Sequence, residues 1–296
     1  MNFQEELNNR VNKIETLIKS YLPGEEGFAI TLAQAMNYSM CAGGKRLRPL
    51  LLQETFRLFG GDSDRLAAPF MAAIEMIHTH SLIHDDLPAL DNDDYRRGIL
   101  TTHKKYGEAM GVLSGVALLN YAYETMLGAY AVFPGDERIG RAMTVMAHKT
   151  GIYGMLGGQS VDVENDGKPL TREMLDYIYC HKTSALMEAP MAAGAILAGA
   201  SEDETAVVEA AAKKLGLAFQ IQDDVLDVTS TSQELGKPVH SDEKNNKVTY
   251  VTLFGISEAS RMAEELSKES LTLLQSLRRN NEFLEELILY LIHRKK

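Results

Sequence analysis

The chain has 296 residues, of which 45% are hydrophobic and 24% charged, and its formal net charge is −11. This composition is typical of a globular protein that is long enough to bury a large core. The negative charge argues against nucleic-acid binding, which needs a basic face, and it means that an anionic ligand must be captured by local basic groups.

The sequence has no feature of a secreted or membrane-inserted protein. Its N-terminal stretch, MNFQEELNNRVNKIETLIKSYL, lacks the uninterrupted apolar core of a signal peptide. It contains no run of about 18 apolar residues, the length that a spanning helix needs. Cys41 and Cys180 have no ligand spacing and do not indicate a disulfide framework. We therefore expect a cytoplasmic protein without membrane insertion.

Helical periodicity dominates the chain. Near the N-terminus, apolar residues recur every three or four positions and predict an amphipathic helix that ends before Pro23-Gly24. Similar patterns predict helices at 30–42, 47–59, 65–86, 104–129, 136–155, 171–199, 203–231, 247–276 and 281–293. Glycine pairs such as Gly43-Gly44 and Gly157-Gly158 mark breaks between them. With no alternating strand pattern and no low-complexity linker, the sequence predicts an all-α fold in a single domain, residues 1–296.

Two similar aspartate clusters each follow a mostly apolar helix: DDLPALD begins at Asp85 and DDVLD begins at Asp223. In the second cluster, Asp223 and Asp227 are four apart and share a helical face, with Asp224 about 100° round. Such carboxylates suit Mg²⁺, which takes one or two of them together with water and substrate phosphates. A single acidic motif can also be a solvated turn, but two helix ends of this kind can face each other across the central cavity of a bundle.

In the first cluster, Pro88 disfavours a regular helix, so we expect the helix to end near Asp85 and Asp86. The chain would then bend and bring Asp91 back toward them. Carboxylates at the negative end of a helix dipole are destabilising unless a cation lies there. We therefore predict that these three side chains bind metal.

Basic residues form four small groups. These are Lys45 with Arg48 in GGKRLRP, Arg96-Arg97, His181-Lys182-Thr183, and Lys237 with Lys247. Lys45 and Arg48 are three apart, a spacing that places them on one helical face. Singly, each group is typical of surface salt bridges. Together with two metal clusters they predict sites for two diphosphates, one bridged by metal ions and one held by cations alone.

Several motifs stand in the order found in a known family: GGKRLRP, EMIHTHSLIHDDLPALDNDDYRRG, GGQ followed by Asp162, HKT, FQIQDDVLD and GKPVHSDEKNNKVTY. On these motifs, which span essentially the whole sequence, the chain resembles the trans-isoprenyl diphosphate synthases of the bacterial farnesyl diphosphate synthase type. The resemblance implies a single-domain helical bundle around a deep central cavity, the isoprenoid synthase fold, and it implies a homodimer.

The resemblance also implies roles for individual residues. About three Mg²⁺ ions, or Mn²⁺ in their place, would surround an allylic diphosphate. The metal site would consist of Asp85, Asp86, Asp91, Asp223 and Asp227, with Asp224 beside them as a further member of the metal-binding group. Arg96, Lys182 and Lys237 would contact the same diphosphate, and Lys45, Arg48, His78 and Arg97 would hold isopentenyl diphosphate. Thr183 and Gln220 would face a developing carbocation together with Lys182, and Lys247 and Arg294 would help to close the site.

The implied reaction joins isopentenyl diphosphate head-to-tail to dimethylallyl or geranyl diphosphate. When the allylic C–O bond breaks, metals and cations stabilise the charge that develops on the departing diphosphate. The double bond of isopentenyl diphosphate then attacks the cation and a proton is lost, so no protein nucleophile is needed. We expect farnesyl diphosphate as the product. The alternatives are a geranylgeranyl diphosphate synthase and a non-catalytic regulatory subunit of a prenyltransferase.

Other enzyme classes share parts of this pattern. His84-Asp85 also fits the helical HD phosphohydrolases, and terpene cyclases use the same metal chemistry, but neither class accounts for GGKRLRP. His84 could itself be a metal ligand or a general base, and we interpret it instead as a packed, hydrogen-bonded histidine. His78 lies seven residues before Asp85 and so on nearly the same helical face.

The chain departs from the family pattern at a few positions. His80, five residues before Asp85, stands where farnesyl synthases of this type commonly have Tyr and geranylgeranyl synthases a smaller residue. We predict that His80 forms the floor of the product-tail pocket and that some longer products accompany farnesyl diphosphate. Val116 stands where Asp is usual and His240 where Gly is usual, and these changes are expected to affect the rate rather than the reaction.

Overall fold

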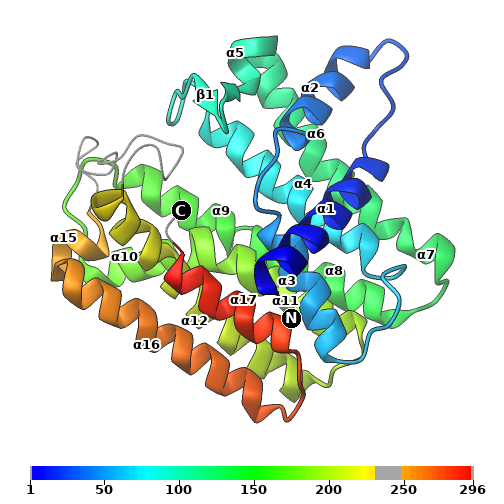
Figure 1. Ribbon diagram of the computed structural model, residues 1–296. Coiled ribbons are helices and arrows are strands. Elements are labelled where there is room, and N and C mark those ends of the chain that lie inside the picture. The colour runs from blue at the N-terminus through cyan, green and yellow to red at the C-terminus, as the bar shows by residue number, and fades with distance from the viewer. Residues whose placement is uncertain (1, 231–247, 295–296) are drawn as a thin grey trace. The chain divides into compact units, whose positions relative to one another are not determined.

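The computed structural model describes residues 2–230 and 248–294 of the chain. These residues are helical apart from loops and one two-stranded hairpin, so the all-α prediction is confirmed (Figure 1). They form two compact units, one of Met1–Gln53 with Asp62–Met143 and the other of Glu54–Gly61 with Thr144–Lys296. That residues 1–296 form a single domain stays a prediction.

The first unit, unit 1, is organised around α4 (Ala68–Asp85), which packs along α6 (Glu108–Leu127). Side chains of α4 such as Phe70, Met71 and Ile74 are fully buried, as expected for a helix that is apolar nearly all round. The other elements are α1 (Phe3–Ser20), α2 (Ile30–Met40), α3 (Leu47–Leu58), β1 (Tyr95–Arg96), β2 (Ile99–Leu100), α5 (Thr102–Tyr106), α7 (Ala129–Val132) and α8 (Glu137–Thr150). Two of the three unit boundaries fall inside α3 and α8, and the third lies in the loop between Gly61 and Asp62.

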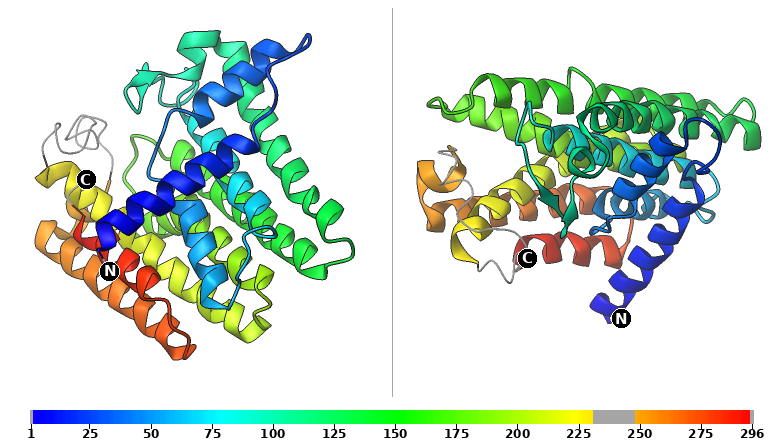
Figure 2. Two further views of the ribbon diagram at one scale, coloured as in Figure 1. Left: turned by 45° about the vertical axis from the view of Figure 1, so that its right-hand side comes forward. Right: turned by 90° about the horizontal axis from the view of Figure 1, so that it is seen from above.

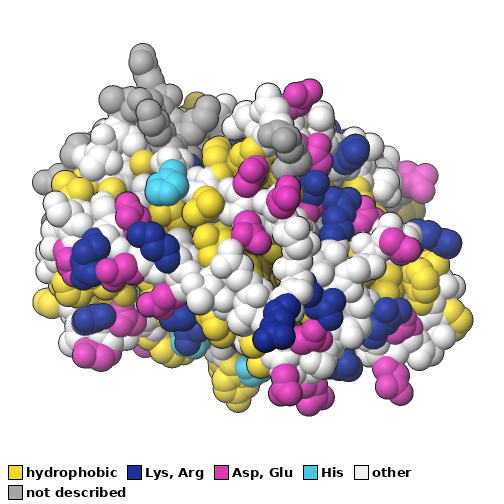
Figure 3. Space-filling view, turned by 60° about the horizontal axis from the view of Figure 1, so that its bottom comes forward, with side chains coloured by type: hydrophobic (Ala, Val, Ile, Leu, Met, Phe, Trp, Pro, Cys, Tyr) yellow, Lys and Arg dark blue, Asp and Glu magenta, His cyan; other side chains and the backbone are white. Residues whose placement is uncertain are grey.

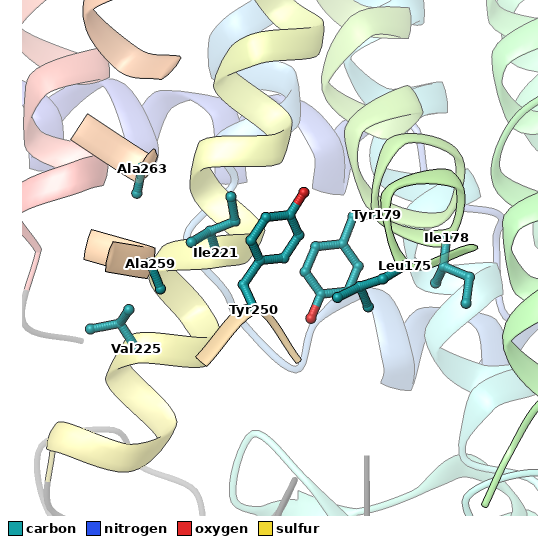
Figure 4. Close-up of a cluster of buried hydrophobic side chains, with 8 residues drawn as sticks. All are labelled: Leu175, Ile178, Tyr179, Ile221, Val225, Tyr250, Ala259 and Ala263. Atoms are coloured by element: carbon teal, nitrogen blue, oxygen red, sulfur yellow. The ribbon is translucent and has the colours of Figure 1, made fainter. Parts of the chain in front are cut away.

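The second unit, unit 2, is organised around the long helix α12 (Glu202–Thr229). It packs against α11 (Ala185–Leu197) and α16 (Ile256–Ser276), and α17 (Glu282–His293) lies beside both α12 and α16 (Figures 1 and 2). The remaining elements are α9 (Met155–Glu164), α10 (Arg172–Ile178), the π-helix η1 (Tyr179–Ser184) and α15 (Tyr250–Phe254). A cluster of buried side chains from α10, η1, α12, α15 and α16 fills the space where these elements meet (Figure 4).

Several helices begin at residues whose side chains satisfy free backbone N–H groups. Ser201 and Glu204 form a reciprocal capping box at the start of α12, with acidic residues in its first turn. Thr171 caps α10 by accepting a hydrogen bond from the backbone N–H of Met174 at 3.3 Å. These local signals explain why the helices begin where they do.

The helices are more broken than the periodicity predicts. Gly107 and Gly255 have φ values of 88° and 80°, a left-handed conformation that favours glycine, and they divide the predicted helices 104–129 and 247–276. The predicted helix 171–199 is divided into α10, η1 and α11. The predicted break at Gly157-Gly158 is wrong, since both residues lie within α9.

The absence of strands was also predicted wrongly. Tyr95 pairs with Leu100 and Arg96 with Ile99 in an antiparallel hairpin. The two turn residues, Arg97 and Gly98, have φ values of 53° and 80°, as a tight two-residue hairpin loop requires. Strands of two residues are too short to leave an alternating sequence pattern.

On the face that Figure 3 shows, acidic and basic side chains are interspersed and no single broad basic patch is present. Among the described residues, the helices are too short or too polar for any of them to cross a membrane.

Candidate functional site

The acidic end of α4 has the predicted bend. The helix ends at Asp85, and the backbone N–H of Asp91 donates a hydrogen bond to the carbonyl oxygen of Asp85 at 2.9 Å. A second bond, from the N–H of Asn92 to the carbonyl of Leu87 at 3.1 Å, closes the same turn. The bend expected at Pro88 is therefore confirmed, and it returns the backbone of Asp91 to the end of the helix.

Asp86 is the buried member of this group, with 3% of its surface exposed. Burial raises its pKa to about 6, even though the Arg96 guanidinium lies 2.6 Å from its carboxylate oxygen. An anion that is this poorly solvated gains from a nearby cation. The donor set consists of carboxylate oxygens only, which suits Mg²⁺ rather than a softer metal.

The hairpin of unit 1 carries Arg96 and Arg97, whose side chains contact different groups. Arg96, in β1, pairs with Asp86 and more weakly with Asp93, whose carboxylate lies 3.5 Å away. Arg97, in the turn, reaches the GGKRLRP segment, where its Nη1 donates to the carbonyl oxygen of Gly43. A Cβ atom at Gly44 would lie 2.8 Å from the Arg97 guanidinium carbon, so only glycine leaves room for this contact.

His78 lies among these cations. Burial, together with the charges of Arg48 and Arg97, lowers its pKa well below the usual value, so its ring is neutral at pH 7. Its Nδ1 atom is buried and has no hydrogen-bond partner within residues 2–230 and 248–294. A neutral ring with an unsatisfied polar atom beside two arginines fits the predicted contact with an anion.

Lys45 and Arg48 do not share a helical face as predicted. The helix α3 begins only at Leu47, so Lys45 lies in the loop before it. Arg46 stands between them with φ of 46°, and this left-handed residue redirects the chain between the two predicted phosphate ligands.

Arg46 is a residue of this segment that the sequence reasoning missed. Its side chain is fully buried and donates to Glu15 at 2.6 Å, to Glu75 at 2.7 Å and to the carbonyl oxygen of Met40 at 2.6 Å. It thereby fastens the GGKRLRP segment to α1 and α4. No local pattern reveals this role, because Glu15 and Glu75 are distant in the sequence.

Two of the histidines of α4, His80 and His84, face α6. His84 lies 3.2 Å from the carbonyl oxygen of Val112 through Nε2 and meets the ring of His80 edge-on, with 4.6 Å between the ring centroids. This confirms a packed, hydrogen-bonded His84. His80 is buried and lies 2.9 Å from the carbonyl oxygen of Gly115 through Nδ1, and burial next to His84 lowers its pKa to about 4. Val116, in contrast, is 52% exposed.

In unit 2, Lys182 lies on the π-helix η1 and pairs with Asp162 of α9 at 2.5 Å. A Cβ atom at Gly158 would lie 2.2 Å from the backbone nitrogen of Lys182. Gly158 of the GGQ motif therefore lets α9 pack closely against η1. The next residue, Thr183, donates its hydroxyl to Oε1 of Gln220 at 2.9 Å.

The three aspartates of DDVLD lie on α12 in different surroundings. Asp223 is 37% exposed, and its Oδ1 accepts a hydrogen bond from Arg294, whose guanidinium also lies 3.9 Å from the Phe219 ring centre. Asp227, one helical turn on, is buried. Asp224 is also buried, and its carboxylate accepts hydrogen bonds from protein groups, including the Tyr179 hydroxyl at 2.7 Å. Asp223 is therefore the most accessible carboxylate of the motif.

Two predicted ligands, Lys237 and Lys247, lie outside the described residues, as does His240. Within the described ranges, no three His, Cys, Asp or Glu side chains converge closely enough to hold a metal ion unaided.

Comparison with known proteins gives a consistent result. A curated protein of Geobacillus stearothermophilus named farnesyl diphosphate synthase is 44% identical over 264 residues, which cover 88% of this chain and 86% of that one. A protein of Cyanophora paradoxa named geranylgeranyl diphosphate synthase is 44% identical over 257 residues, covering 86% and 84%.

A solved structure of a Helicobacter pylori geranyltransferase, complexed with magnesium and isoprenyl diphosphate, matches with a TM-score of 0.85. Its sequence identity is 32%, and the match covers 99% of this chain and 97% of that one. The family model described as polyprenyl synthetase matches residues 30–287. The chain belongs to the polyprenyl synthetase family.

Proposed function

We propose that the protein condenses isopentenyl diphosphate with dimethylallyl or geranyl diphosphate and releases mainly farnesyl diphosphate. The observation that carries this proposal is the arrangement in unit 1. There, the carboxylates at the end of α4 adjoin a group of cations, and the ion pair of Asp86 with Arg96 links the two sets. Neighbouring acidic and basic groups of this kind suit one diphosphate bound through metal and another bound directly.

The carboxylates fit magnesium, and Asp85, Asp86, Asp91, Asp223 and Asp227 would hold it. When bound, Mg²⁺ supplies positive charge that stabilises the departing diphosphate. The lysine and arginine side chains add to this effect, because Arg96 and Lys182 would contact the same leaving group. The Thr183 hydroxyl oxygen and the Gln220 amide, joined at 2.9 Å, would face the allylic cation and stabilise it.

Isopentenyl diphosphate would bind to the cations of the GGKRLRP segment and the hairpin, namely Lys45, Arg48, His78 and Arg97. Their role is to place the double bond for attack on the cation. Supported by the resemblance alone, the same proposal includes a single catalytic domain, a homodimer, about three Mg²⁺ ions per site, Mn²⁺ as a substitute metal, and a cytoplasmic location. Lys237 and Lys247 stay part of the predicted diphosphate site.

The direct test is to incubate the purified protein with isopentenyl diphosphate, Mg²⁺ and either allylic diphosphate. We expect release of diphosphate and, by chromatography of the dephosphorylated products, a main peak of farnesol. If no diphosphate is released with either primer, the protein is better explained as a regulatory subunit. If diphosphate is released without isopentenyl diphosphate being consumed, the chemistry is that of a hydrolase or cyclase.

Gly44→Ala should weaken binding of isopentenyl diphosphate. The new Cβ would displace Arg97, so we expect the KM for this substrate to rise about tenfold, the equivalent of one charged hydrogen bond, with kcat little changed. Gly135→Ala is the matched control, because Gly135 also has a positive φ of 78° but nothing lies within 4 Å of its Cβ position. An unchanged KM in Gly44→Ala would remove Arg97 from the substrate site.

His80→Tyr should shorten the products. Phenol is larger than imidazole, and His80 is buried against Gly115, so the added atoms must take space from the neighbouring interior. We expect the ratio of C20 to C15 product to fall relative to the wild type, measured by chromatography at equal conversion. Identical distributions would exclude His80 as the floor of the tail pocket. A wild-type protein that makes mainly C20 product would favour the geranylgeranyl alternative, as the Cyanophora relative suggests.

A further inference from the structure

Two side-chain hydrogen bonds, here called rungs, connect η1 to α12. In the first, the Thr183 hydroxyl donates to Gln220 Oε1 at 2.9 Å, and in the second, the Tyr179 hydroxyl donates to Asp224 Oδ2 at 2.7 Å. Tyr179 and Thr183 are four residues apart on η1, and Gln220 and Asp224 are four apart on α12. A longer contact, 3.4 Å from Gln220 Nε2 to Asp224 Oδ1, joins the two rungs. The four side chains form one network, which we call the η1–α12 ladder.

Asp224 carries the largest number of these contacts. Only 3% of its surface is exposed, so its charge depends on protein donors rather than on water. Besides Tyr179 and Gln220, the backbone N–H of Tyr250 donates to Asp224 Oδ2 at 3.1 Å. Its neighbour Asp223 has 37% of its side chain exposed. Within one DDVLD motif, the first aspartate is therefore partly exposed and paired with Arg294, whereas the second is buried and held by donors from η1, α12 and α15.

The ladder is anchored in the core of unit 2. The rings of Tyr179 and Tyr250 lie with centroids 5.5 Å apart, within the buried cluster that Figure 4 shows. The Tyr250 hydroxyl in turn donates to Asp176 of α10. Burial and the Asp176 carboxylate both raise the pKa of Tyr250, so this hydroxyl keeps its proton. Tyr179 through its hydroxyl and Tyr250 through its backbone N–H both donate to Asp224 Oδ2, so these two packed residues fix the orientation of the carboxylate.

The ladder holds a π-helix that carries residues of the proposed site. A π-helix is rare and is found mostly at functional sites. Here it carries Lys182, which would contact the diphosphate, and Thr183, which would face the allylic cation. Side-chain contacts from η1 reach the DDVLD segment of α12 directly through Tyr179 and, by way of Thr183, through Gln220.

We propose that Asp224 and Tyr179 are positioning residues, and that they hold Lys182 and Thr183 in register with the carboxylate of Asp223. In this role Asp224 is not a metal ligand. The inference rests on the proposed function for the identity of the reacting groups, whereas the ladder itself belongs to the fold of unit 2.

The experiment compares Tyr179→Phe, Asp224→Asn and Asp223→Asn. Tyr179→Phe removes a single hydroxyl and keeps the ring packing. For Tyr179→Phe and Asp224→Asn we expect kcat to fall about tenfold or more, as for the loss of a residue that orients a ligand, with the Mg²⁺ concentration for half-maximal rate within twofold of wild type. For Asp223→Asn that concentration should rise at least tenfold. Tyr153→Phe is the control, since Tyr153 is 71% exposed and should behave as wild type.

A second measurement does not depend on activity. Hydrogen–deuterium exchange of the amides of residues 179–184 should be faster in Tyr179→Phe than in wild type and unchanged in Asp223→Asn, whether or not the wild type condenses prenyl diphosphates. Inactive wild-type protein would refute the proposed function, and the exchange data would still decide on the ladder. The inference is overturned if Asp224→Asn shifts the Mg²⁺ requirement as far as Asp223→Asn does, or if Tyr179→Phe changes neither kcat nor exchange. If Asp224→Asn does not fold, Tyr179→Phe alone gives the answer.

Discussion

Asp85→Asn is expected to reduce kcat on the order of 10³-fold while leaving the protein folded. Asp85 lies at the last position of α4 and is partly exposed, and the returning backbone of Asp91 closes the turn beside it. Loss of one ligand charge removes several kcal/mol of stabilisation from the departing diphosphate, and each 1.36 kcal/mol is tenfold in rate. The measurement is kcat at saturating substrates over a range of Mg²⁺ concentrations.

The matched control is Asp94→Asn. Asp94 belongs to the same acidic segment, but its side chain is 61% exposed and pairs with Lys104 at 2.7 Å, so its loss should change kcat less than twofold. Thermal melting of both variants separates catalysis from stability. Asp85→Asn protein that melts like the wild type and keeps more than a tenth of its kcat would show that Asp85 does not bind the metal.

Sequence patterns predicted the helices and the acidic bend because both arise from local physics. Apolar residues repeat with the helical period wherever a helix buries one face, and Pro88 stops α4 whatever surrounds it. The helix breaks at Gly107 and Gly255 were not predicted, because the apolar periodicity continues across these glycines. At the glycines of GGQ the error was the opposite one, since a break was predicted where the helix continues. They look like a break, but Gly158 permits the close packing of α9 on η1, which is a tertiary effect.

The candidate site was predictable only where its residues form a motif. Charged residues that could contact diphosphate are visible as types and spacings. The residues that orient them are not, because their partners are distant in sequence: Tyr179 and Asp224 are 45 residues apart, and Arg46 and Glu75 are 29 apart. The π-helix also has no local signature. A motif therefore identified Asp224 as part of an acidic cluster, but its partners in the fold distinguish it from Asp223.

Arg46→Met should destabilise the protein by about 3 to 5 kcal/mol, the cost of removing one partner from a buried ion pair. Glu75 is 2% exposed and would be left with an uncompensated charge, whereas Glu15 is 24% exposed and can recover water. For a chain of this size such a loss lowers Tm by about 10 °C. Calorimetry or chemical denaturation of the full-length protein measures this loss of stability.

The effect of Arg46→Met on stability should depend on pH. Burial tends to raise the pKa of Glu15, but the hydrogen bond and charge of Arg46 outweigh it and hold the pKa below its usual value. The carboxylate of Glu15 therefore stabilises the wild type at neutral pH, and this contribution is lost as the pH falls through the lowered pKa. In that acidic range, the difference in free energy of unfolding between the wild type and Arg46→Met should become smaller.

Arg46→Met combined with Glu75→Met replaces the buried pair by apolar side chains and should recover most of the lost stability. It should not recover substrate binding. Arg46 has φ of 46° and sets the direction of the chain between Lys45 and Arg48, so the KM for isopentenyl diphosphate should stay raised in both variants. A double variant with wild-type KM would mean that the loop keeps its shape without Arg46, and that the buried arginine serves stability alone.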